Sequence, residues 1–175
     1  KALTSLETEW KEFKPLIVAM PGKEGAVTLY DANEALQKAA HYVTLAYEDV
    51  NLAPLDHLVN LAGRERMLTQ RMAKFFLYRT WNLYIEPADM EMTLSRAHFT
   101  AVLIQIESSP YATTQIKELV IQIRRNWEPY QQALFVSRDP EIMRNYTQHV
   151  TELSEQLLTG TEELVALAKI AGEFG

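Results

Sequence analysis

Apolar residues recur at three- and four-residue steps along nearly the whole chain, and this spacing predicts helices throughout. Six helical stretches follow from the spacing and from the proline and glycine residues between them. They cover residues 2–19, 26–50, 56–84, 89–107, 113–136 and 140–171. Strict two-residue alternation never persists, so the pattern does not favour strands.

Residues at the starts of three stretches support these boundaries. Asp56 is predicted to cap the third stretch, and Thr113 or Thr114 the fifth, because their side-chain oxygens can accept from unpaired backbone amides. Asp139 followed by Pro140 fits a capping residue with proline at the first helical position. The third, fifth and sixth helices therefore each have a start signal.

The order of the stretches predicts an all-α chain in two parts. The last four alternate with short connections, which is typical of an antiparallel four-helix bundle, here over residues 56–171. The first two form a helical hairpin over residues 1–52 that looks like the second half of an earlier repeat. Residues 7–17 resemble 124–135, and residues 36–46 resemble 157–168. The alternative is that amphipathic helices simply resemble one another.

Composition narrows the classes of function. The net charge of −6 and the pI near 5.3 argue against nucleic-acid binding, which needs a basic surface. The absence of cysteine excludes disulfides, thiolate metal sites and cysteine nucleophiles. The four histidines have no metal-ligand spacing, and no nucleotide loop or catalytic pair is visible, so no metal, cofactor or enzymatic activity is predicted. No apolar run reaches the ~18 residues of a membrane span, so any membrane anchor is expected to lie outside this sequence.

The helix predicted over residues 56–84 differs from the others because it carries two apolar sides. One side is large and suits the bundle core; it contains Leu58, Leu61, Leu68, Met72, Phe75 and Phe76. The other side contains Leu55, Val59, Ala62, Gly63, Arg66, Gln70, Ala73 and Leu77. A surface helix in a simple bundle needs only one apolar stripe, so the smaller side predicts a further partner, most simply the same helix of a second subunit.

Arg66 lies among the small residues of that second side. Gly63 in mid-helix costs about 1 kcal/mol relative to alanine, so it calls for a packing or functional reason. Two symmetry-related Arg66 side chains would repel unless an anion lay between them, and a planar nitrate or carboxylate matches the guanidinium. Gln70 could add a hydrogen bond. The alternative, which wheel geometry alone favours, is an ion pair between Arg66 and an acidic residue; Arg64 and Arg71, on the opposite flank, are expected to be solvated or ion-paired.

Residues 58–77, LVNLAGRERMLTQRMAKFFL, resemble the signature of the PilJ-type sensor domain. That domain is the N-terminal domain of type IV pili methyl-accepting chemotaxis transducers. The segment is more distantly similar to the P-box of the nitrate and nitrite sensor kinases NarX and NarQ. The residues that carry the resemblance are Asn60, Ala62, Gly63, Arg64, Arg66, Met67, Leu68, Gln70 and Arg71.

The resemblance implies an all-helical, extracytoplasmic ligand-sensing domain of bacteria, usually dimeric. In the nitrate-sensing relatives an arginine three residues after the motif glycine binds the anion at the dimer axis, and the corresponding residue here is Arg66. Those relatives have a neutral pair between the glycine and the arginine, whereas this chain has Arg64 and Glu65. Glu65 is expected to add negative charge near the site, so the sequence predicts a small anion rather than nitrate in particular.

Two functional hypotheses follow. The first is a periplasmic signal-input domain, a homodimer that binds a small anion through Arg66, with Gly63, Asn60, Gln70 and Arg64 as further binding residues. The second is a free-standing periplasmic helical module that binds another protein and takes no small ligand. A transmembrane helix directly after residue 175 in the full-length protein would favour the first.

Overall fold

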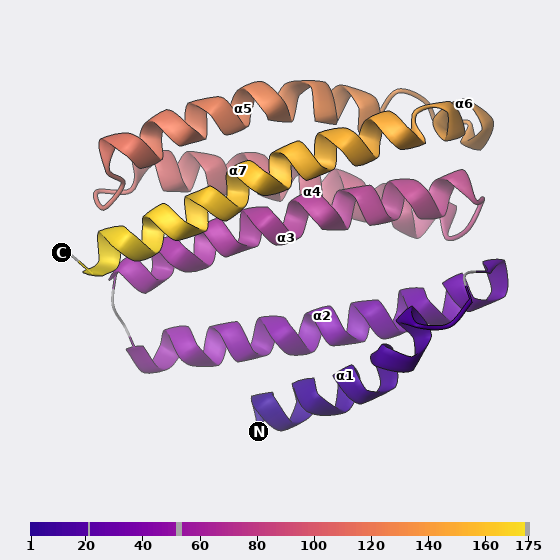
Figure 1. The fold of residues 1–175 in the computed structure, drawn as a ribbon, viewed down its shortest axis with the longest axis horizontal. Coiled ribbons are helices and arrows are strands. Elements are labelled where there is room, and N and C mark those ends of the chain that lie inside the picture. The colour runs from indigo at the N-terminus through magenta and orange to yellow at the C-terminus, as the bar shows by residue number, and fades with distance from the viewer. Residues whose placement is uncertain (21, 52–53, 174–175) are drawn as a thin grey trace. The chain divides into compact units, whose positions relative to one another are not determined.

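The computed structural model describes residues 1–20, 22–51 and 54–173, and the elements found there are helices (Figure 1). Contacts divide the chain into two compact units, residues 1–53 and 54–175. The predicted all-α class is confirmed. Residue 52, the predicted end of the hairpin, and residue 53, in the interval before the second predicted domain, lie outside the described residues. The partial repeat stays a prediction.

The first unit is a helical hairpin. Helix α1 (Ala2–Ile17) packs against helix α2 (Lys23–Asn51), and Trp10 lies over Phe13 with ring centroids 6.1 Å apart. None of the α1 side chains is buried, and on α2 only Tyr30 and Ala39 are, among those described. Two helices alone enclose little volume, so this unit has almost no core of its own.

The second unit is a four-helix bundle made by α3 (Pro54–Thr80), α4 (Ile85–Ser108), α5 (Thr114–Leu134) and α7 (Thr147–Glu173). Helix α3 packs against α4 and α7, and α5 packs against the same two helices. Short connections between successive helices make neighbours antiparallel. The core is filled by side chains from all four helices, including Phe75, Phe76, Phe99, Ile123, Tyr130 and Leu157.

Two of the predicted start signals are confirmed. The Thr113 hydroxyl accepts from the Ile116 amide at the start of α5, at 3.3 Å. A short helix, α6 (Pro140–Asn145), begins after Asp139, whose carboxylate accepts from the Glu141 amide at 2.8 Å. Both bonds satisfy amides that no preceding turn can reach.

Other boundaries differ from the prediction. Helix α3 starts at Pro54, so the expected cap at Asp56 is wrong; proline is suited to the first helical turn, where its missing amide costs nothing. The same helix ends at Thr80 instead of 84, because Asn82 and Tyr84 adopt left-handed backbone angles (φ 60° and 48°). Helix α4 then begins at Ile85.

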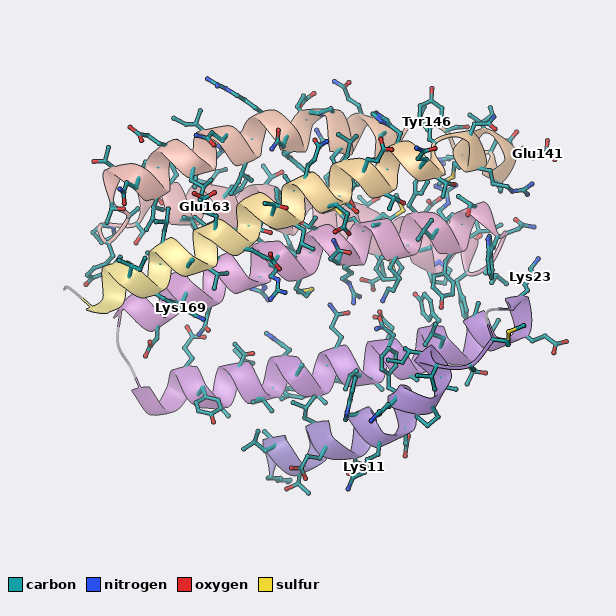
Figure 2. The ribbon with its side chains drawn as sticks, in the orientation of Figure 1. Lys11, Lys23, Glu141, Tyr146, Glu163 and Lys169 are labelled. Carbon is teal, nitrogen blue, oxygen red and sulfur yellow. The ribbon has the colours of Figure 1, made fainter. Side chains whose placement is uncertain are left out.

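The stretch predicted as one helix over residues 140–171 is interrupted once. Helix α6 ends and α7 begins around Tyr146, which Figure 2 labels at this junction. The Tyr146 amide bonds to the Met143 carbonyl at 2.9 Å, and the Val150 amide bonds to the Tyr146 carbonyl at 2.8 Å. The chain therefore passes from one helix into the next with little loss of backbone hydrogen bonding.

Candidate functional site

Helix α3 carries the motif segment, and its larger apolar side forms part of the bundle core as predicted. The six residues assigned to that side are all buried: Leu58, Leu61, Leu68, Met72, Phe75 and Phe76. Phe75 also lies under the Arg71 guanidinium, whose carbon is 4.8 Å from the ring centroid. Arg71 itself is ion-paired with Glu91 of α4 at 2.8 Å, which confirms the expected structural role of this arginine.

The smaller apolar side of α3 is divided between the bundle interior and the surface, and the side chain of Leu55 lies outside the described part. Ala62 and Ala73 are buried, Gly63 and Gln70 are half-buried, and Arg66 and Leu77 are exposed. Helix α3 needs two apolar sides because it packs against two helices of its own bundle, α4 and α7. A second subunit is therefore not required to explain Ala62 and Ala73. The residues left for an outside partner are the ones around Gly63.

Arg66 forms an ion pair with Glu162 of α7. The distance from Arg66 Nη2 to Glu162 Oε1 is 2.9 Å, and the two side chains are 56% and 50% exposed. An ion pair of Arg66 with an acidic residue is the alternative that the sequence analysis left open. Exposed pairs of this kind contribute about 0–1 kcal/mol, because water and salt screen both charges. The contact holds Arg66 in place weakly, and an anion competing with Glu162 has little to displace.

The space beside Gly63 is open within the described part of the chain. A Cβ built on this glycine would have nothing within 4 Å, apart from the helix itself. At Gly160 of α7 the same atom would lie 3.3 Å from Cγ1 of Ile123, so that glycine serves packing inside the bundle. No such packing explains Gly63. The stability that Gly63 costs the helix is therefore not offset by packing inside this bundle.

Replacing Gly63 with alanine is expected to raise the free energy of unfolding by about 0.5–1 kcal/mol, because alanine loses less backbone entropy in a helix. Thermal or urea unfolding of the whole chain measures this gain. Gly160→Ala is the matched control, since its added methyl group meets Ile123 and should gain less or lose stability. An equal gain at both positions would contradict the assignment of Gly63 to an open surface.

The remaining predicted binding residues lie around Gly63 on α3. Asn60 is half-buried and Arg64 is exposed. Gln70 has a buried amide nitrogen, Nε2, with no hydrogen-bond partner among the described residues. A buried donor without an acceptor costs about 1–3 kcal/mol. Gln70 follows Arg66 by one helical turn, so an acceptor bound near Arg66 would come close to this donor.

Glu65 does not lie where the sequence interpretation placed it. Its side chain is completely buried in the bundle, and both carboxyl oxygens lack a hydrogen-bond partner within the part of the chain that the structure describes. Burial raises the pKa of the Glu65 carboxyl to about 10, against the weaker opposing effects of Arg124 and Arg64. The group is therefore neutral at physiological pH. The expected negative charge near Arg66 is wrong, because desolvation makes the buried carboxylate far less stable than the acid.

A helical wheel would have revealed this position. Glu65 follows Leu61 by four residues and precedes Leu68 by three, so it lies in the middle of the core stripe. The backbone around it is tied into the bundle as well. The Thr69 hydroxyl donates to the Glu65 carbonyl at 3.0 Å, and the Tyr130 hydroxyl of α5 donates to the Thr69 carbonyl at 2.8 Å. The motif helix therefore turns one face, with Glu65, into the core and the adjacent face, with Arg66, toward the surface.

Among the described residues no three histidine, aspartate or glutamate side chains come together in a group that could hold a metal ion. In the same residues, no helix is long and apolar enough to cross a bilayer. Arg66, Gly63 and Gln70 on α3 therefore remain the candidate site.

The comparison with protein families gives a match over residues 55–153, which is more than half of the chain and includes α3, α4, α5, α6 and the start of α7. The matching family is described as the type IV pili methyl-accepting chemotaxis transducer N-terminal domain, PilJ. No curated protein and no solved structure matched. This family consists of chemotaxis transducer sensor domains, which serve in signal input. On the strength of a match that spans the motif segment, residues 58–77, and most of the bundle, the chain belongs to the PilJ family of chemotaxis transducer N-terminal domains.

Proposed function

We propose that this chain is an extracytoplasmic signal-input domain that binds a small anion on the outer face of α3, where two copies meet. Arg66 is the main ligand in this proposal. Gly63 lets the second copy approach closely, and Asn60, Gln70 and Arg64 contribute polar contacts. The observation that carries the proposal is the combination of an exposed, weakly held arginine with an open glycine on one motif helix.

Electrostatics favour an anion over a neutral ligand. Arg66 cannot lose its charge, and two copies of it facing each other would repel unless a negative group lay between them. Glu65, on the same turn of helix, is neutral and buried, so it does not oppose the anion. Gln70 adds a donor that lacks an acceptor. The neutrality of Glu65 removes the main argument against nitrate, so nitrate and small carboxylates are both suitable probes.

Signal transfer in this proposal depends on exchange between two partners of Arg66. With no ligand, Arg66 binds Glu162 of α7. When an anion takes the guanidinium, α7 loses that contact with α3. The shift that results is limited by the difference in anion affinity between the two arrangements. Helix α7 carries Glu162, so in this proposal it is the element that passes the change onward.

The test is calorimetric titration of the whole chain with nitrate and with acetate. Arg66→Ala is expected to lower the affinity at least tenfold, which corresponds to about 1.4 kcal/mol. Glu162→Gln removes the competing carboxylate and is expected to raise the affinity severalfold. Arg125→Ala, at an exposed arginine of α5, is the matched control and should change nothing. Binding heat that survives Arg66→Ala would refute this site.

The second candidate is a helical module that binds another protein without a small ligand. It is favoured by the Arg66–Glu162 pair, since an arginine already neutralised within its own chain does not need an anion. It predicts no binding heat with nitrate or acetate for the wild type and for Glu162→Gln alike. The same titrations therefore distinguish the two candidates.

A further inference from the structure

Helix α4 carries a second apolar face that the bundle does not use. On the side toward the core it buries Ala88, Met92, Ser95, Phe99, Val102, Leu103 and Ile106. Five exposed apolar residues follow one another at steps of four, three, four and three along the opposite side. These residues, called here the α4 stripe, are Met90, Leu94, Ala97, Ala101 and Ile104. Their spacing is that of a coiled-coil seam.

The exposure of the α4 stripe is substantial. Met90 is 58% exposed, Leu94 45% and Ile104 54%, so no other helix of the four-helix bundle covers this side of α4. Scattered exposed apolar residues are normal, but a continuous row along a helix marks an interaction site. Side-chain size also varies along the α4 stripe. Large side chains stand toward its ends, and the two alanines stand at its centre.

Charge along the α4 stripe favours contact with an identical surface. Two acidic residues beside the α4 stripe are ion-paired, because Glu91 pairs with Arg71 of α3 at 2.8 Å and Glu107 pairs with Arg124 of α5 at 2.9 Å. Glu86, which is exposed, lies one turn before Met90 at the end of the stripe. The other flanking residues toward the middle are Thr93, His98, Thr100 and Gln105. A charged partner would find no unpaired opposite charge there. A second copy of the stripe that runs antiparallel meets no repulsion, because its middle is equally uncharged and the two Glu86 side chains then lie at opposite ends.

We infer that the α4 stripe pairs with the α4 stripe of a second copy of this chain, with the two helices antiparallel. In this register Leu94 of one copy meets Ile104 of the other, and Ala97 meets Ala101. The two-fold axis then passes between the alanines, where the short side chains allow the helices to approach closely. The same residues contact each other from both sides, as a two-fold interface requires.

The length of the contact sets its strength. Helix α4 has 24 residues and is therefore about 36 Å long. One stripe of this length buries less than the roughly 800 Å² per partner that stable complexes bury. The pairing is accordingly weak and reversible. It is also separate from the proposed anion site, because the α4 stripe contains no residue of α3.

Sedimentation velocity on the whole chain, over a concentration range up to roughly 1 mM as weak interfaces require, tests the pairing. The wild type is expected to show a concentration-dependent association step that Ile104→Glu abolishes. Ile121→Glu is the matched control, since Ile121 is a 46% exposed isoleucine on α5 outside the stripe. Arg66→Ala should also leave this step unchanged, which separates it from anion binding on α3. Absence of the step in the wild type, its survival in Ile104→Glu or its loss in Ile121→Glu overturns the inference.

Disulfide trapping tests the orientation, because the chain has no cysteine of its own. A mixture of Leu94→Cys and Ile104→Cys chains is expected to form the mixed disulfide, since antiparallel pairing places these two positions together. Each variant alone should form little, because its cysteines lie at opposite ends of the contact, beyond the ~7 Å Cα separation that a disulfide can span. Efficient cross-linking of either variant with itself would show parallel pairing and overturn the antiparallel register.

Discussion

Replacing Glu65 with glutamine is expected to raise the free energy of unfolding at pH 7.5 by up to about 4 kcal/mol, with no gain at pH 4. The carboxyl is completely buried, and its pKa is raised from 4.5 to about 10 by desolvation. Folding above pH 4.5 therefore requires Glu65 to take up a proton that the unfolded chain has released. Glutamine has the same shape and remains neutral, so the variant avoids this cost.

The sign of the pH dependence follows from the direction of the shift. Glu65 disfavours the native state least below pH 4.5, where it is protonated in both states. Its cost grows as the pH rises from 4.5 toward 10, because only the folded chain keeps the proton. Urea unfolding of the wild type and of Glu65→Gln at several pH values should give two curves that meet near pH 4 and diverge above it.

A control shows whether the effect comes from burial. Glu163 of α7 is exposed, and Glu163→Gln should change the free energy of unfolding by less than about 0.5 kcal/mol at every pH. Parallel pH curves for the wild type and Glu65→Gln would mean that Glu65 is not protonated in the core. In that event Arg124 or Arg64, the two charges that act on it, would have to stabilise the carboxylate.

Asp89→Ala is expected to lower the free energy of unfolding by about 2–4 kcal/mol, because it leaves a buried arginine without its counter-charge. Arg79 of α3 is nearly inaccessible, and its Nη1 lies 2.5 Å from Oδ1 of Asp89 in α4. Its Nη2 also donates to the Arg138 carbonyl at 2.9 Å, while Nε has no partner among the described residues. Arg79 therefore joins α3, α4 and the connection before α6.

Two further variants separate the effect of burial from the loss of an ion pair. Glu107→Ala breaks the exposed pair with Arg124 and should cost less than about 1 kcal/mol. The double variant Arg79→Met, Asp89→Ala removes both charges and is expected to be more stable than Asp89→Ala alone. Urea unfolding measures all three. Equal losses for Asp89→Ala and Glu107→Ala would contradict the buried role of Arg79.

Local sequence patterns predicted the helices well because helix formation depends on near neighbours. Thr113 and Asp139 gave correct starts, since each cap bond closes within two or three residues. The predicted helix cap at Asp56 was wrong, because Pro54, two residues earlier, also fits the first turn of a helix. The interruption near Tyr146 left no mark in the apolar spacing, which continues from Met143 to Val150.

At the candidate site the sequence alone does not predict which group contacts Arg66. The resemblance and the wheel both singled out Arg66, and the motif helix carries it at the surface as the wheel suggested. The choice between an anion and an acidic residue as the partner of Arg66 depends on where α7 lies, and Glu162 of α7 comes about one hundred residues later in the chain. The structure brings Glu162 within 2.9 Å of Arg66, and no local pattern predicts that distance.

Residues 58–77 by themselves determined the family, the motif helix and its core-facing side, because these depend on residue types at helical spacing. The helical spacing places Glu65 on the core-facing side, but only the tertiary structure decided its complete burial and its protonation, the open space at Gly63 and the exposed apolar side of α4. Burial is a property of everything packed around a side chain. The helices that pack against α3 and bury Glu65, Ala62 and Ala73 come from later parts of the chain.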